Sequence, residues 1–195
     1  MAIVKAEVKD FSVFSKMEME FCEGINVITG AKGVGKTHLL KLLYAASQAE
    51  EEKNFAVDMG PFGLYKFNNI GEESGCVSGI HIFSQVKDGV LEFIQQHVLD
   101  MYVTSFKHVV FVPEGEEIPT NVKELKEKYI VTNDTILLLQ DPPPTVSLIN
   151  GLLELSREGV QVILSSCDNN FAEQFNQQKT TTDKVRLQNL FAPAK

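Results

Sequence analysis

The chain has 195 residues, 44% hydrophobic and 23% charged, an ordinary composition for one globular domain spanning residues 1–195. Its formal net charge of −8 argues against direct nucleic-acid binding by this chain, because a phosphate backbone requires a positive protein face. No apolar run approaches the thickness of a bilayer, and the N-terminus lacks the pattern of a signal peptide. We therefore expect a cytoplasmic protein with no membrane partner.

Two segments near the N-terminus alternate between apolar and polar residues. Residues 3–9 and 16–21 both show this period of two, which predicts half-buried antiparallel strands. Residues 25–29 form a short apolar run that is typical of a buried strand, and residues 38–46 have the composition of a helix. A glycine-rich connection joins this strand to this helix.

The connection, residues 30–37, fits the phosphate-binding pattern G-x-x-x-x-G-K-[ST] without a mismatch. Its glycines allow backbone turns in which successive N–H groups converge on an anion. Lys36 would reach the β- and γ-phosphates, and the Thr37 hydroxyl would bind Mg²⁺. An ordinary glycine-rich turn is the alternative, but the helix that follows favours a nucleotide, because its dipole would face the phosphates. We expect the nucleotide to contact Gly30, Ala31, Lys32, Gly33, Val34, Gly35, Lys36, Thr37 and His38.

The middle of the chain combines an acidic run with further strand patterns. The acidic run 50–52 is most simply a solvated helix end, and residues 63–68 and 77–84 predict two further strands. With the N-terminal strands, these would form an antiparallel β lobe from about 1–24 and 60–86. Asp88 then resembles the N-cap of a helix. The apolar residues at helical spacing in this expected helix are Val90, Leu91, Ile94, Val98, Leu99 and Tyr102.

From residue 108 onward, short apolar strands alternate with helices. This alternation predicts an α/β fold of the P-loop NTPase type, with a mainly parallel, doubly wound sheet and the antiparallel lobe attached. We expect strands at 108–112, 135–139, 161–165 and 184–187, and helices at 121–129, 146–157 and 171–178.

This order of parts resembles the ABC-type ATPases, in particular the DNA-repair and chromosome-maintenance (SMC-like) branch and its AAA relatives. The resemblance is most specific over residues 24–46 and also extends over 135–166. It implies that the chain binds ATP and Mg²⁺. No residue pattern for reading guanine is present, so the choice of ATP over GTP rests on this resemblance.

The chain departs from that family at the positions that serve hydrolysis. In the family, the strand before a proline ends in Asp, which orients Mg²⁺, and Glu, which polarises the attacking water. Matching on the proline places Gln140 at the Asp position and Asp141 at the Glu position. Moving the alignment by one residue makes Asp141 the Mg²⁺ residue and leaves Pro142 where the base should be. One acidic function is missing in either alignment, and Asp141 could alternatively serve only to cap the turn.

Three further features of the family bear on this chain. Cys167 stands where the family has a histidine that contacts the γ-phosphate, and Gln85 is a candidate for the metal-sensing glutamine at a strand end. The Leu-Ser-Gly-Gly signature is missing. We therefore expect an ATP-binding, ABC/AAA-type protein with slow or vestigial hydrolysis. Its bound ATP or ADP would govern assembly with a protein partner or as a homodimer.

Two other functions remain open at this stage. The chain could be a non-enzymatic interaction module that keeps a nucleotide as a structural ligand. It could also be a small-molecule P-loop kinase, but those enzymes carry arginines in a lid over the transferred phosphate. Arg157 and Arg186 are the only arginines here, and neither lies in a lid-like segment.

Overall fold

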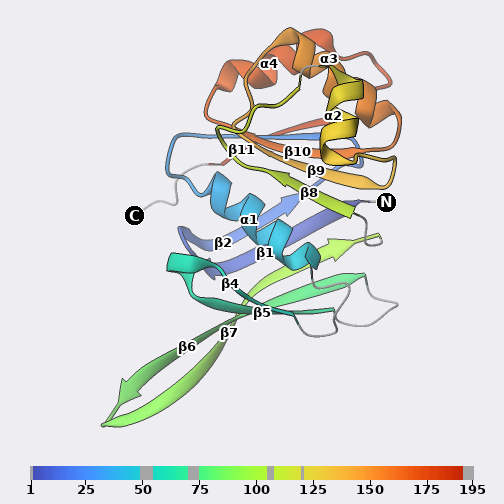
Figure 1. Cartoon of the computed structure of the whole chain (residues 1–195). Helices are drawn as coiled ribbons and strands as arrows, with labels where there is room; N and C mark the ends of the chain where they lie inside the picture. Colours follow the sequence, from blue (N-terminus) through green and yellow to red (C-terminus); the bar gives the residue numbers. More distant parts are fainter. Residues whose placement is uncertain (1, 49–54, 70–74, 105–107, 120, 191–195) are drawn as a thin grey trace.

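A computed structural model describes residues 2–48, 55–69, 75–104, 108–119 and 121–190. In these residues the chain forms one parallel and one antiparallel sheet, and the helix α1 (Lys36–Ser47) lies between them (Figure 1). The acidic run 50–52 lies outside the described residues. Among the described helices, none is both long enough and apolar enough to cross a membrane.

The parallel sheet forms the centre of the fold. Its three inner strands, β3, β10 and β9, are buried along their whole length, which explains why their sequences are apolar without alternation. All neighbouring strands of this sheet run parallel. In spatial order the sheet consists of β11 (Val185–Asn189), β3 (Ile25–Thr29), β10 (Gln161–Ser166), β9 (Thr135–Gln140) and β8 (His108–Val112).

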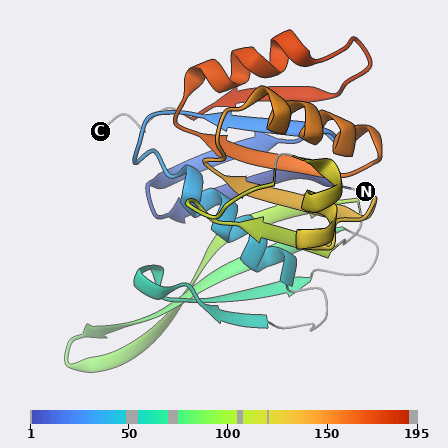
Figure 2. The same cartoon turned by 45° about the horizontal axis from the view of Figure 1, so that its top comes forward.

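Helices cover both faces of the parallel sheet, as Figures 1 and 2 show. The helix α1 packs on one face, and its leucines at 39, 40, 42 and 43 are fully buried in the core that the two sheets share. A second core fills the other face. The predicted α/β class with a doubly wound, mainly parallel sheet is therefore confirmed. The helices on the second face are α2 (Val122–Tyr129), α3 (Val146–Arg157) and α4 (Asn169–Gln178).

The antiparallel sheet is larger than the sequence predicts. The N-terminal hairpin of β1 and β2 pairs through β1 with β7, which joins it to the strands of the middle of the chain. The lobe expected over about 1–24 and 60–86 therefore also includes β4 and β7. In spatial order its strands are β2 (Phe14–Glu20), β1 (Ile3–Phe11), β7 (Val90–Val103), β6 (Cys76–Lys87), β5 (Leu64–Asn69) and β4 (Phe55–Asp58).

The prediction of a helix after Asp88 is wrong, because residues Val90–Val103 form the strand β7. Asp88 and Gly89 both have positive φ angles, 51° and 77°, and form the two-residue turn of a long β6–β7 hairpin. Turns of this kind match the twist of the strands they join. The tip of the hairpin projects away from the rest of the molecule (Figure 1), and the Phe93 side chain near it is 75% exposed.

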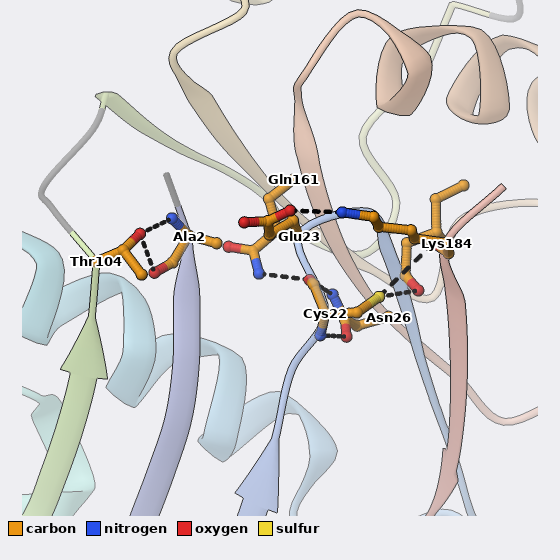
Figure 3. Close-up of polar contacts among 8 residues, drawn as sticks. Ala2, Cys22, Glu23, Asn26, Thr104, Gln161 and Lys184 are labelled. Atoms are coloured by element: carbon orange, nitrogen blue, oxygen red, sulfur yellow. Dashed lines mark hydrogen bonds and ion pairs between the residues drawn. The ribbon is translucent and has the colours of Figure 1, made fainter. Parts of the chain in front are cut away.

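A network of polar side chains joins the two sheets at the beginning of β10 (Figure 3). The Gln161 side chain is fully buried and accepts a hydrogen bond from the N–H of Ile3 at 2.9 Å. Its amide donates to the carbonyl oxygens of Ile3 and Cys22, both at 2.8 Å. Asn26 on β3 holds the Cys22 backbone in the same network. A side chain of the parallel sheet therefore satisfies backbone groups at the start of β1 and in the turn that follows β2.

Candidate phosphate-binding site

A cavity of about 610 Å³ lies at the carboxyl ends of the parallel strands. Ligands of open α/β sheets bind at this edge, and the volume suits a small-molecule ligand. Four segments that are distant in sequence meet there. They contribute Lys32, Gly33, Gly35, Lys36, Thr37 and His38, then Glu114, then Asp141, Pro142, Pro143 and Pro144, and finally Ser166, Cys167 and Asp168.

The glycines of the loop between β3 and α1 have the backbone geometry that the motif requires. Gly33 and Gly35 have φ angles of 88° and 96°, which residues with a side chain rarely adopt. A Cβ at Gly35 would lie 2.6 Å from side-chain atoms of Val13 and Phe14 on the antiparallel lobe. At Gly33, by contrast, no atom lies within 4 Å of such a Cβ, so the backbone there is open to a ligand.

The N-terminus of α1 has no side-chain cap. Its N-cap residue is Gly35, which has no side chain to accept hydrogen bonds from the first-turn amides. These amides and the positive end of the helix dipole favour an anion. Thr37 and His38 stand in this first turn and line the cavity.

Lys36 is a buried cation whose ammonium group is held by the loop. Its Nζ donates to the carbonyl oxygens of Gly30 at 2.8 Å and Ala31 at 3.0 Å, and its third contact is Cys167 Sγ at 3.3 Å. The residue is only 4% exposed. Among the described residues, no carboxylate lies within ion-pair distance of it. A buried charge without a counter-charge is costly, so this arrangement favours an anionic ligand.

Asp141 fixes the end of β9 to the end of β10. Its Oδ1 accepts a hydrogen bond from the Cys167 N–H at 2.8 Å, and its own N–H donates to the Ser165 carbonyl oxygen at 3.0 Å. Its φ angle of 43° is unusual for a residue with a side chain, and these two hydrogen bonds maintain it. Asp141 therefore holds Cys167 next to Lys36. The carboxylate itself lines the cavity.

Gln140 and Glu114 form a pair that the sequence does not reveal. The Gln140 side chain, on the last residue of β9, donates from Nε2 to Glu114 Oε2 at 3.3 Å. Gln140 is only 8% exposed, whereas Glu114 is exposed and lines the cavity. Glu114 stands two residues after β8, beside the end of β9. Its position two residues after the parallel strand β8 was the one signal that could have identified it.

His38 connects the start of α1 to the antiparallel lobe. Its Nδ1 contacts the Ser12 hydroxyl, and its ring packs edge-on against Phe62 with 4.3 Å between the ring centres. Burial, and to a lesser extent the positive charge of Lys41, lower the pKa of His38 below its ordinary value. The imidazole is therefore neutral at pH 7.

Some of the residues expected in the site do not line the cavity. Gly30 and Ala31 act through their carbonyl oxygens on Lys36, and Val34 is buried beneath the loop. Gln85 lies on the exposed β6–β7 hairpin, where it donates to Glu92 at 3.5 Å, and the structure does not bring it to the cavity. No cluster of three or more His, Cys, Asp or Glu residues in the described part of the chain could hold a metal ion by itself.

Comparisons with known proteins support the resemblance to DNA-repair proteins. No protein-family model matches the chain. It is 25% identical over 135 residues to the DNA replication and repair protein RecF of Oceanobacillus iheyensis, and 22% identical over 135 residues to that of Bacillus thuringiensis. Each match covers 67% of this chain but only 37% and 36% of the respective relative. The chain thus spans just over a third of the length of these relatives.

A solved structure, the SMC head domain from Thermotoga maritima, aligns with 89% of this chain and 92% of its own, at 12% identity and a TM-score of 0.45. The RecF matches confirm the resemblance to the DNA-repair and chromosome-maintenance branch of the ABC-type ATPases.

Proposed function

We propose that the chain binds ATP and Mg²⁺ in this cavity, hydrolyses ATP slowly, and uses the bound nucleotide to govern assembly with a protein partner or a second copy. The observation that carries the proposal is the Lys36 ammonium group. It is buried and held by two carbonyl groups, and the described residues give it no carboxylate partner. Such a cation is suited to a phosphate group.

The residues around Lys36 fit a polyphosphate. The open backbone at Gly33 and the uncapped first turn of α1 provide amides on the same side of the loop. Thr37 and Asp141 both line the cavity and offer the oxygen ligands that Mg²⁺ prefers. Bound ATP would supply the phosphate groups, and Mg²⁺ would neutralise part of their charge.

Slow hydrolysis follows from the residues that have replaced the family's acids. Gln140 is neutral and cannot offset the charge of a metal ion. Asp141 uses one carboxylate oxygen to hold the Cys167 backbone, which constrains it as a base. Cys167 itself replaces the histidine that contacts the γ-phosphate in the family. Each change removes charge or freedom from a position that serves hydrolysis in the related proteins.

The relationship to RecF suggests the setting in which the nucleotide acts. RecF is named a DNA replication and repair protein, and we place the proposed assembly in that process. The net charge of −8 suggests that a partner, rather than this chain, contacts the DNA. A small-molecule kinase is disfavoured, because Arg157 bonds to Asp183 and Arg186 bonds to Glu20, and neither arginine lines the cavity.

The replacement Lys36→Ala tests the proposed site. We expect it to weaken ATP binding at least about 100-fold, because charge-assisted hydrogen bonds contribute about 1.5–3 kcal/mol each and about 1.4 kcal/mol is tenfold in affinity. Titration calorimetry with ATP and with ADP, each with and without Mg²⁺, measures the effect. Lys41→Ala is the matched control, because Lys41 is exposed on the same helix and does not line the cavity.

Three results would count against the proposal. If Lys36→Ala leaves the affinity for ATP unchanged, the nucleotide does not bind at this loop. Equal affinity for ATP and ADP would instead favour a structural nucleotide in an interaction module. If the unmodified chain hydrolyses ATP within seconds and Asp141→Asn abolishes this hydrolysis, the proposal of slow hydrolysis is wrong. Asp141 would then be the base.

A further inference from the structure

We propose that Glu114 is the carboxylate that orients and deprotonates the water for ATP hydrolysis, and that Gln140 is its positioning residue. This inference rests on the proposed function, since it assigns a reaction to a nucleotide in the same cavity. At the end of β9 the chain lacks one of the two acids that the ABC-type ATPases have there. The missing carboxylate comes from the loop after β8 rather than from the end of β9.

The hydrogen bonds of the cavity favour Glu114 over the other acids. Three acidic side chains of the described residues line it: Glu114, Asp141 and Asp168. Asp141 accepts from the Cys167 N–H, and Asp168 caps α4 by accepting from the Asn170 N–H at 2.8 Å. Both carboxylates therefore stabilise backbone turns. The described residues give Glu114 a single hydrogen bond, from an uncharged amide at 3.3 Å. Its carboxylate keeps most of its acceptor capacity for a water molecule.

Gln140 and Glu114 are chemically complementary. Gln140 is buried at the end of β9, and its amide reaches the exposed carboxylate of Glu114 across the gap between the two strand ends. An amide donor orients a carboxylate without neutralising its charge. An aspartate at position 140 would instead place a second negative charge beside Glu114 and repel it. The neutral residue at 140, which looks like a loss in the sequence, is what allows an acid at 114.

The reaction assigned to Glu114 is a proton transfer coupled to phosphoryl transfer. Glu114 accepts a proton from the water while the water oxygen forms a bond to the γ-phosphorus. The bond from that phosphorus to the β,γ-bridging oxygen breaks, and its electron pair leaves on ADP. Glu114 then returns its proton to the inorganic phosphate product, so it ends in its original form. Lys36 and the loop amides hold the phosphate oxygens during this transfer.

Glu114→Gln tests the assignment with two independent measurements. Single-turnover hydrolysis, followed by extraction of the bound nucleotide and its identification as ATP or ADP, should slow at least about 100-fold, as expected for loss of a general base. The equilibrium affinity for ATP should stay the same or rise a few-fold, because a negative charge beside the triphosphate has been removed. A purely structural role for Glu114 would lower both quantities.

Two more variants sharpen the test. Glu117→Gln is the matched control, because Glu117 is exposed on the same loop and does not line the cavity, and it should hydrolyse ATP at the unmodified rate. Gln140→Leu removes the donor that positions Glu114, and it should slow hydrolysis about tenfold while the affinity for ATP is retained.

The outcomes separate this inference from the proposed function. It is overturned if Glu114→Gln hydrolyses ATP within threefold of the unmodified chain, or if ATP affinity falls together with the rate. It is also overturned if the unmodified chain binds ATP but leaves it intact in the single-turnover experiment. If the unmodified chain does not bind ATP at all, the proposed function fails instead, and Lys36→Ala then has no effect.

Discussion

The Cys167 thiol lies beside the Lys36 ammonium group and lines the same cavity. Its Sγ is 3.3 Å from Lys36 Nζ, and its backbone N–H is held by Asp141. The residue is exposed, so reagents can reach it from the cavity. Its reactivity towards an alkylating agent therefore reports on whether the cavity beside the loop 30–37 is occupied.

We expect ATP to protect Cys167 from alkylation. At ATP ten times its Kd, about one site in eleven is free, so the rate with iodoacetamide should fall about tenfold. Mass spectrometry of the modified peptide measures it. Cys167→Ser gives the background from Cys76, which is buried, and from Cys22, which is half-buried and contacts the Ile25 and Lys184 carbonyl oxygens. An alkylation rate that ATP does not change would place the nucleotide elsewhere.

The loop at residues 30–37 could be identified as a candidate site from the sequence, whereas Glu114 could not. The loop motif is local in sequence, and each glycine and the lysine has a physical reason for its position. Glu114 acquires its place from the parallel pairing of β8 with β9, which brings it into contact with Gln140, 26 residues away. No spacing rule within one segment expresses such a contact.

The strand β7 was wrongly predicted as a helix, although most of its partner β6 was predicted as a strand. Its apolar residues follow a helical spacing because the environment of β7 changes along its length. The outer half is exposed, the inner half is buried against β1 and β6, and a register shift follows Gly79 on β6. The alternation of apolar and polar residues that is typical of a strand is therefore interrupted along β7. The pair Asp88-Gly89 was the correct signal, because it is favoured in two-residue hairpin turns.

Gly89→Val should destabilise the tip of this hairpin while the rest of the molecule remains folded. The φ angle of Gly89 is 77°, and no atom lies within 4 Å of a Cβ built there. The cost is therefore backbone strain of about 1–2 kcal/mol without a clash. Hydrogen exchange should become about tenfold faster for amides near the Gln85–Glu92 pair. Asp88→Asn is the control, because asparagine tolerates this conformation. Unchanged exchange in Gly89→Val would show that the turn does not determine the stability of the hairpin tip.

At the scale of the whole molecule, the cavity and the joint between the sheets lie at opposite ends of β10. Gln161 begins this strand and holds the first residues of β1, whereas Ser166 ends it at the cavity. The alternation of strands and helices predicted the parallel sheet, but not this joint. A glutamine in an apolar run gives no indication that it will satisfy backbone groups more than 130 residues away.

Gln161→Leu should therefore destabilise the whole fold. The side chain is fully buried, and its loss leaves the N–H and carbonyl of Ile3 and the carbonyl of Cys22 without their partner. Unsatisfied buried groups cost about 1–3 kcal/mol each, so we expect the free energy of unfolding in urea to fall by about 3 kcal/mol.

Gln161→Glu separates hydrogen bonding from packing, because it keeps the shape of the side chain and the acceptor for Ile3 but loses both donors. It should be at least as destabilising as the leucine variant, since it also buries a charge. Gln177→Leu, at an exposed position on α4, should change the unfolding free energy by no more than about 0.5 kcal/mol. If all three variants unfold at the same urea concentration, hydrophobic packing around α1 alone joins the two sheets. Altered ATP affinity in the two Gln161 variants would then have to come from a change at the cavity rather than from a loosened joint.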